Sequence, residues 1–204
     1  KPENIRVVFD SSSEYQGTTL NKELLSGPNV LNSLLGILMR FRQETVGVAC
    51  DIEQMFHCFY VDPKDRDVLR FFWFKDNNPN EEIVEYHMTV HLFGNTSSPA
   101  IATFGLRKTA VDGEEKFGES AKEFVCNDFY VDDGLTSRRT AAEAIHLVKT
   151  TQTMLSTANI RLHKVTSNSV EVITAFPKQD RDAKLKELNL SCDPLKTQRS
   201  LGLC

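Results

Sequence analysis

The sequence lacks long apolar runs and any excess of basic residues. Within its 204 residues, the longest apolar stretch, around 31–41, is interrupted by Asn32, Ser33 and Arg40. It is far shorter than the roughly 18 apolar residues that a membrane-spanning helix needs. Lysine and arginine number 24 against 28 acidic residues, so the net charge is −4. This balance argues against a generally basic nucleic-acid-binding surface, and any polyanion must be bound by local patches.

Several common enzyme and metal-site motifs are also missing. The five cysteines are Cys50, Cys58, Cys126, Cys192 and Cys204. None belongs to a C-x-x-C pair, so neither a disulfide framework nor a zinc ribbon is indicated, and a reducing, intracellular compartment is expected. Gly-x-Ser-x-Gly and Gly-x-x-x-x-Gly-Lys motifs are absent, which leaves hydrolase and P-loop functions without support. His87 and His91 lie in a predicted strand and lack the helix and glutamate of a zincin.

What is present is an ordinary globular composition, with 40% hydrophobic and 25% charged residues. This composition excludes a disordered, collagen-like or coiled-coil chain. Apolar periodicity and turn residues predict strands at 5–10, 46–52, 71–74, 83–92, 124–131, 135–136, 161–166 and 200–204, and helices at 30–43, 63–69, 98–112, 140–158 and 178–190. The order of these elements predicts an α+β fold, in which helices cover one face of an antiparallel sheet.

Three carboxylates are the main candidates for chemistry. Asp51 stands in the nearly continuous apolar strand 46–52, where a charged side chain is unusual, and Asp132 and Asp133 follow another strand pattern at a hairpin turn. Two-metal phosphoryl transfer needs hard oxygen ligands that hold two Mg²⁺ ions about 4 Å apart, and acids on adjacent strands can supply them. The alternative interpretation is that Asp132-Asp133-Gly134 is ordinary turn chemistry and that Asp51 merely ends a strand.

The segments around these acids resemble, in the same order, the motifs of reverse transcriptases. Asp51-Ile52-Glu53-Gln54-Met55-Phe56-His57 is similar to the first carboxylate motif of that family, and Tyr130-Val131-Asp132-Asp133 to its Tyr-x-Asp-Asp signature. Between them, residues 92–99 resemble the glycine-containing loop that ends on Ser-Pro at a helix start. Later, residues 162–164 and 201–202 fall where the family carries a lysine and the Leu-Gly of its primer grip.

Three segments resemble in particular the Pao/BEL branch of long-terminal-repeat retrotransposons: 6–10, 88–94 and 129–133. The resemblance covers essentially the whole chain, and implies a polymerase palm with part of the fingers subdomain. The fingers would comprise about 1–26 and 59–96, and the palm about 27–58 and 97–204. Thumb and RNase H are not represented, and the first residue is not methionine, so we expect the chain to be a fragment of a Pol polyprotein.

The resemblance implies an RNA-directed DNA polymerase that transfers deoxynucleotides to a primer 3′-hydroxyl. Its catalytic residues would be Asp51, Asp132 and Asp133, and the same acids with Ile52 would hold two Mg²⁺ ions, or Mn²⁺. The nucleotide-binding residues would be Lys1, Arg6, Phe56, Gly94, Tyr130 and Lys164. Implied partners are an RNA or DNA template-primer, dNTPs and the protease, RNase H and integrase of the polyprotein. No membrane partner is implied, and the location would be a cytoplasmic particle or the nucleus.

Individual residues in this set have simpler interpretations. Phe56 would leave no room for a ribose 2′-hydroxyl, but an aromatic residue at such a position is also common in a core. Arg6 would bind phosphate oxygens, although a strand-end arginine is most often solvated. The basic pairs Arg107-Lys108 and Arg138-Arg139 either contact the template-primer backbone or are solvated helix ends.

Two other functions compete with the polymerase interpretation. A non-catalytic retroelement remnant could persist as a fold or interaction module, but a neutral relic would be free to lose any of the three acids. A palm RNA polymerase is disfavoured by the aromatic Phe56 and by Tyr130 before Val131.

Overall fold

The computed structural model describes residues 9–182, which divide into two units. The first unit comprises the chain up to Pro28 together with Phe56–Ala102, and the second comprises Asn29–Met55 and the chain from Thr103 onward. The strand predicted at 200–204, most of that at 5–10 and most of the helix at 178–190 lie outside the described residues. The three candidate acids belong to the second unit.

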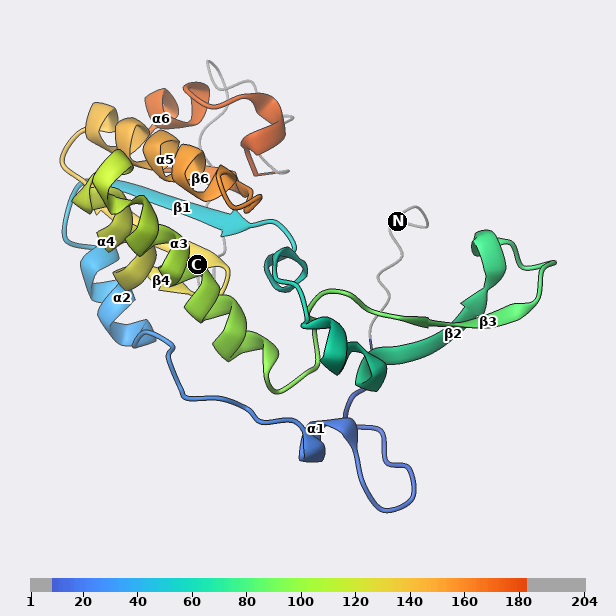
Figure 1. Cartoon of the computed structure of the whole chain (residues 1–204). Helices are drawn as coiled ribbons and strands as arrows, with labels where there is room; N and C mark the ends of the chain where they lie inside the picture. The colour runs from blue at the N-terminus through green and yellow to red at the C-terminus, as the bar shows by residue number, and fades with distance from the viewer. Residues whose placement is uncertain (1–8, 183–204) are drawn as a thin grey trace. The chain divides into compact units, whose positions relative to one another are not determined.

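A four-stranded antiparallel sheet lies at the centre of the second unit (Figure 1). Its strands, in spatial order, are β4 (Phe129–Tyr130), β5 (Asp133–Arg138), β1 (Val46–Ile52) and β6 (Leu162–Ser167). In β1, Val48, Cys50 and Ile52 are buried and the residues between them are partly exposed, because successive side chains of a strand point to opposite faces. One face of this apolar strand is therefore buried and the other is partly exposed.

Helices α4 (Glu119–Asn127) and α5 (Ala141–Ser156) pack on the face of the sheet that carries Cys50. The ring of Phe124 in α4 lies 5.1 Å from that of Phe129, which covers Gly134, the residue paired with Cys50. Helix α5 begins as its sequence predicts, because the hydroxyl of Thr140 accepts a hydrogen bond from the backbone N–H of Glu143. The short helix α6 (Val170–Thr174), which the sequence pattern did not predict, packs against α5 and β6.

Helix α2 (Leu34–Phe41) lies against the opposite face, at one end of the sheet. A Cβ atom on Gly47 would come within 3.1 Å of the Phe41 ring. Gly47 alternates with Ala49 and Asp51, so α2 and Asp51 share this face. The helix begins one turn later than predicted because the Ser33 side chain caps its first turn, accepting from the backbone N–H of Gly36.

Two predicted elements differ in the structure. Helix α3 (Ser98–Phe117) continues past Gly113, where it was expected to end. This glycine serves packing instead, because a Cβ there would come within 2.8 Å of Met154 in α5. The first half of the strand predicted at 124–131 belongs to helix α4, whose buried residues Ala121, Phe124 and Val125 follow helical spacing, and Phe129–Tyr130 form β4.

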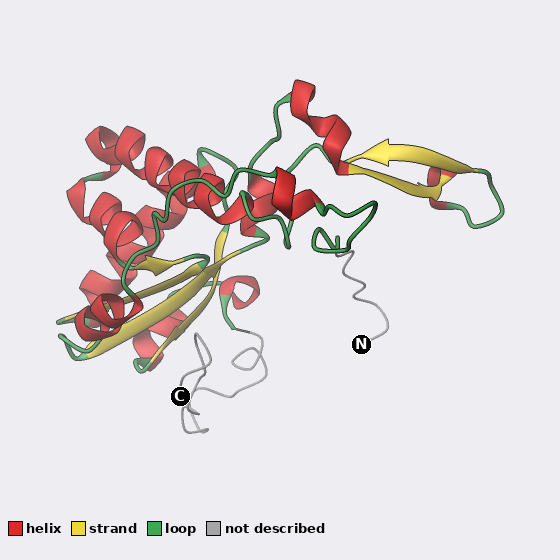
Figure 2. Cartoon of the chain, turned by 90° about the horizontal axis from the view of Figure 1, so that it is seen from below, coloured by secondary structure: helices red, strands yellow, loops and turns green. Residues whose placement is uncertain are grey.

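The first unit contains a two-stranded hairpin and a small apolar cluster. The hairpin pairs β2 (Arg70–Phe74), close to its predicted range, with β3 (Ile83–His87), which ends five residues before the predicted Leu92 (Figure 2). The remaining elements are α1 (Leu20–Glu23) and the 3₁₀ turns η1 (Met55–Cys58), which begins at the unit boundary, η2 (Pro63–Leu69) and η3 (Lys75–Asn77). Val61, Leu69 and Leu92 form the cluster. Among the described residues, no helix is both long and apolar enough to cross a bilayer.

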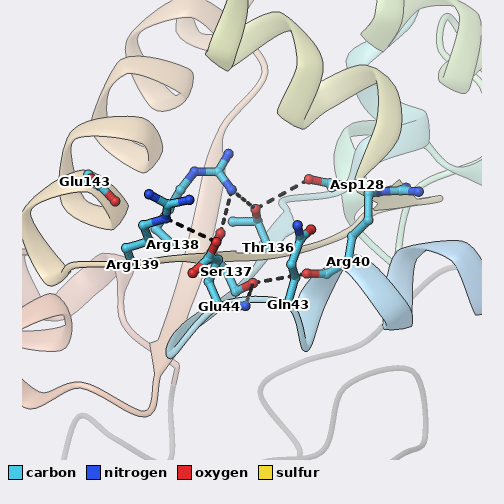
Figure 3. A pocket seen from close by; sticks show the side chains of 9 residues that line it. All are labelled: Arg40, Gln43, Glu44, Asp128, Thr136, Ser137, Arg138, Arg139 and Glu143. Carbon is cyan, nitrogen blue, oxygen red and sulfur yellow. Dashed lines mark hydrogen bonds and ion pairs between the residues drawn. The ribbon is translucent and has the colours of Figure 1, made fainter.

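A polar network ties α2 to the end of the β1–β5 ladder that is distant from Asp51. The Arg40 Nε donates to the buried carboxylate of Asp128 at 2.7 Å, and the hydroxyl of Thr136 donates to the same carboxylate at 3.4 Å. The Ser137 hydroxyl donates to the Arg40 carbonyl at 3.0 Å. These side chains line a cavity of about 330 Å³ (Figure 3). The network holds the sheet end in register while the other end carries the acids.

Replacing Asp128 should test this network. In Asp128→Ala, Arg40 and the buried Thr136 lose their shared acceptor, so the free energy of unfolding should fall by about 1–3 kcal/mol. The control is Glu44→Ala. The Glu44 carboxylate lies 3.4 Å from Nε of Arg139, whose side chain is 80% exposed, so removing this ion pair should lower the free energy of unfolding by less than about 1 kcal/mol. Urea unfolding of both variants measures the difference, and equal losses would contradict the assigned role of Asp128.

Candidate active site

The antiparallel ladder places Asp51 opposite Asp133, with Asp132 in the adjoining turn. Asp51 of β1 pairs with Asp133 of β5, and the backbone N–H of Ile52 donates to the carbonyl of Asp132 at 2.9 Å. Directly opposed residues of an antiparallel pair have Cβ atoms about 5 Å apart on the same face. The acids of the two sequence motifs therefore meet at one end of the sheet.

The turn that carries Asp132 is one residue earlier than its sequence predicts. Tyr130 pairs with Asp133, so Val131 and Asp132 form the turn, while Asp133 and Gly134 already belong to β5. Val131 has a φ of 55°, a left-handed conformation that costs a residue with a Cβ about 1–2 kcal/mol. Such strain is concentrated at functional sites, where the surrounding structure enforces it.

The carboxylate of Asp51 is held by two consecutive residues of β6. Nε2 of His163 lies 2.9 Å from Oδ1, and Nζ of Lys164 donates to Oδ2 at 2.9 Å. An ionised carboxylate only accepts hydrogen bonds, so the imidazole Nε2 carries the proton of this contact. The sequence marked Lys164 as a nucleotide ligand and assigned no role to His163. Strand β6 places both on Asp51.

Asp51 and Asp132 have opposite electrostatic environments. Burial acts to raise the pKa of Asp51, but the hydrogen bonds from His163 and Lys164 and the lysine charge outweigh it, so that pKa lies below its ordinary value. Burial raises the pKa of Asp132, and the negative charge of Asp51 adds to this rise. Asp51 is therefore ionised at neutral pH, while the surroundings of Asp132 disfavour its charge.

The donor chemistry of this sheet end fits a hard divalent cation. Asp51, Asp132 and Asp133 offer carboxylate oxygens, and Ile52 offers a backbone carbonyl, which are the ligand types that Mg²⁺ prefers. Within residues 9–182, however, no three His, Cys, Asp or Glu side chains converge into a group that could hold a metal ion. His163 and Lys164 occupy both oxygens of Asp51 in this arrangement.

The other predicted nucleotide-binding residues are distributed over both units. In the first unit, Phe56 is 7% exposed, and its ring meets that of Phe93 edge to face at 4.5 Å. Gly94 has a φ of +97°, and a Cβ there would come within 2.8 Å of the carbonyl of Phe9, so only glycine fits. In the second unit, Tyr130 is partly exposed beside the turn. Lys1 and Arg6 lie outside the described residues.

The loop around Gly94 is held by side-chain hydrogen bonds within the first unit. The Asn21 amide donates to the Gly94 carbonyl at 2.8 Å, and its oxygen accepts from the backbone N–H of Thr96 at 3.0 Å. The Ser11 hydroxyl donates to the buried side chain of Asn95 at 2.5 Å. Asn21 and Ser11 thus fix this loop, although sequence reasoning gave neither a role.

Comparison with known proteins supports the fold. No protein-family model and no curated protein matches the sequence. Among solved structures, the chain is similar to a foamy viral protease-reverse transcriptase dRH in complex with ds DNA, with a TM-score of 0.54 and 20% identity over 77% of this chain and 23% of that one. A foamy viral protease-reverse transcriptase in complex with an RNA/DNA hybrid gives a TM-score of 0.48 and 18% identity over 65% and 15%. The chain spans less than a quarter of either protein. Its fold of helices and antiparallel sheet is reverse-transcriptase-like.

The raised pKa of Asp132 predicts a gain in stability when its charge is removed. A carboxyl that binds its proton more tightly in the folded state destabilises the fold above that pKa, so Asp132→Asn should stabilise the metal-free protein at pH 7. The gain should stay below about 1 kcal/mol because the carboxylate is partly solvated. As the pH falls through the folded pKa toward the unfolded value of about 3.9, the parent should recover this stability and the difference should vanish.

Asp51→Asn is the matched comparison, and it should change the stability at pH 7 in the opposite direction, by destabilising the fold. The lowered pKa of Asp51 means that its charge stabilises the fold above the unfolded value, and that this contribution disappears as the pH falls through the folded pKa. Urea unfolding without divalent ions, from pH 7 to below pH 3, measures both variants. Destabilisation by Asp132→Asn at pH 7 would show that the electrostatic assignment of this acid is wrong.

Proposed function

We propose that this chain is the central part of an RNA-directed DNA polymerase from a Pao/BEL-type long-terminal-repeat retrotransposon. The observation that carries the proposal is the placement of Asp51 opposite Asp133, with Asp132 in the adjoining strained turn. Its support is the reverse-transcriptase-like fold. The second unit would be the palm, and the first unit would be part of the fingers.

Asp51, Asp132 and Asp133, with the carbonyl of Ile52, would hold two Mg²⁺ ions, or Mn²⁺. When bound, such ions lower the pKa of an attacking hydroxyl and neutralise a leaving pyrophosphate. The chain contributes a carboxylate at Asp51 that stays ionised at neutral pH, and a strained turn that fixes Asp132. Positioning and charge neutralisation then supply most of the catalysis.

The substrates follow from the same proposal. The primer 3′-hydroxyl of an RNA or DNA template-primer attacks a dNTP, which Arg6 and Lys1 would bind through its phosphates. Phe56 would lie below the sugar, and its contact with Phe93 would hold the ring in place. The protease, RNase H and integrase of a Pol polyprotein are the further proposed partners.

Loss of one acid should abolish primer extension. In the complete protein that contains this chain, Asp132→Asn should lower Mg²⁺-dependent extension of a DNA primer on RNA by about 10²–10³-fold or more, since a main electrostatic contribution is removed. Glu44→Gln, which removes an equal charge before the far end of β1, is the control and should retain activity. Extension by Asp132→Asn at the parental rate would exclude the two-metal assignment. Inactivity of the parent itself would favour the non-catalytic remnant.

Shortening Phe56 should admit ribonucleotides. If the ring excludes the 2′-hydroxyl by its size, Phe56→Val should reduce the dNTP-to-rNTP ratio of kcat/KM by about 10–100-fold. Phe93→Leu, which removes the neighbouring ring and leaves Phe56, should change this ratio much less. An unchanged ratio in Phe56→Val, with the thermal midpoint retained, would identify Phe56 as a core residue only.

A further inference from the structure

Two consecutive residues of β6 contact the same carboxylate, which a regular strand does not allow. Successive side chains of a strand point to opposite faces, so His163 and Lys164 should lie on different sides of the sheet. The β1–β6 pairing contains an irregularity at this point: Ala49 pairs with Thr166 and Asp51 with His163, so two steps along β1 correspond to three along β6. Strand β6 therefore contains a bulge with one extra residue.

Lys164 is the residue that adapts to this bulge. Its φ is +50°, the left-handed region that a lysine seldom adopts. The bulge turns the Lys164 side chain to the face of His163, and its ammonium group reaches Oδ2 of Asp51 at 2.9 Å. Bulges next to active sites commonly re-aim a side chain in this way. The backbone strain at Lys164 thus has a local consequence, a cation placed on the proposed metal ligand.

The two contacts on Asp51 have different chemical consequences. The His163 side chain is 12% exposed and approaches Oδ1, so it holds the carboxylate in a fixed orientation. The Lys164 side chain is 47% exposed, and its stem is flexible enough to leave. Its ammonium group takes up one lone pair of Oδ2, and its positive charge repels a divalent ion that approaches the same oxygen.

We propose that Lys164 is an internal stand-in cation for Asp51, which a divalent metal ion must displace, and that His163 is a positioning residue that keeps Oδ1 fixed during the exchange. The proposal rests on the proposed function in one respect, that Asp51 is a metal ligand. It makes divalent-ion affinity depend on a residue that never binds the metal.

Mn²⁺ binding, followed by electron paramagnetic resonance on the complete protein that contains this chain, tests the exchange without any assay of activity. Lys164→Gly removes the competing ammonium and suits the left-handed backbone, so Mn²⁺ should bind about two- to fivefold more tightly than in the parent. Lys164→Asn, which also tolerates this conformation, should behave similarly. Arg161→Gln is the charge-matched control: Arg161 pairs with Glu53 and Asp180, and its loss should leave the affinity unchanged.

His163 variants test the positioning role separately. His163→Leu removes the bond to Oδ1 and should weaken Mn²⁺ binding about tenfold or more, as is typical of residues that orient a metal ligand. His163→Gln retains a side-chain N–H donor and should restore most of the affinity. A purely structural role would lower the urea midpoint of both variants without this rescue. Equal weakening by Leu and Gln at parental stability would overturn the positioning role.

The outcomes separate this inference from the proposed function. If Asp132→Asn abolishes Mn²⁺ binding but Lys164→Gly does not tighten it, the proposed role of Lys164 is wrong and the proposed metal site is retained. If Asp132→Asn binds Mn²⁺ as the parent does, the proposed metal site itself is wrong. If the parent binds no Mn²⁺, Lys164→Gly should gain binding, and its failure to do so would overturn both.

Discussion

The hydrogen-bonded register of β1 between β5 and β6 is the constraint on which the candidate site depends. In this register Asp51 faces Asp133 on one side and His163 on the other. A shift by one residue would turn every side chain of β1 to the other face and place the Asp51 carboxylate in the core, where Cys50 now lies. The apolar residues that fill that core therefore also determine where the acids meet. The geometry of the candidate site and the folding of the sheet therefore depend on the same pairing.

The two faces of β1 differ in charge: the core face carries the neutral Cys50 thiol, and the opposite face carries the ionised Asp51. On the core face, burial and the nearby charges of Asp133 and Asp51 raise the pKa of the Cys50 thiol far above its ordinary value. This thiol stays neutral and lies 3.6 Å from the Gly134 carbonyl. On the other face, His163 and Lys164 compensate the desolvation of Asp51. Cys50 therefore keeps its proton because it is buried, whereas its neighbour Asp51 is ionised because His163 and Lys164 donate hydrogen bonds to it.

Backbone strain occurs on both sides of Asp51. Val131 in the β4–β5 turn and Lys164 in the β6 bulge both have positive φ without being glycine. Each is fixed by strand pairing on both sides, which supplies the hydrogen bonds that make the unfavourable conformation tolerable. The turn presents Asp132, and the bulge presents a cation to Asp51. The neighbouring strands therefore hold the β4–β5 turn and the β6 bulge in place, as precise sites generally require.

Local sequence was sufficient for elements whose signals lie within a few residues, such as β1, the β2–β3 hairpin and the start of α5 at Thr140. The candidate acids were also identified from sequence, because their motifs are contiguous. Tertiary structure decided the rest. Phe124 and Val125 suit a strand or a helix equally, and packing against the sheet selected the helix. The contact of His163 and Lys164 with Asp51 depends on a bulge between strands far apart in the chain, and no local pattern encodes that register.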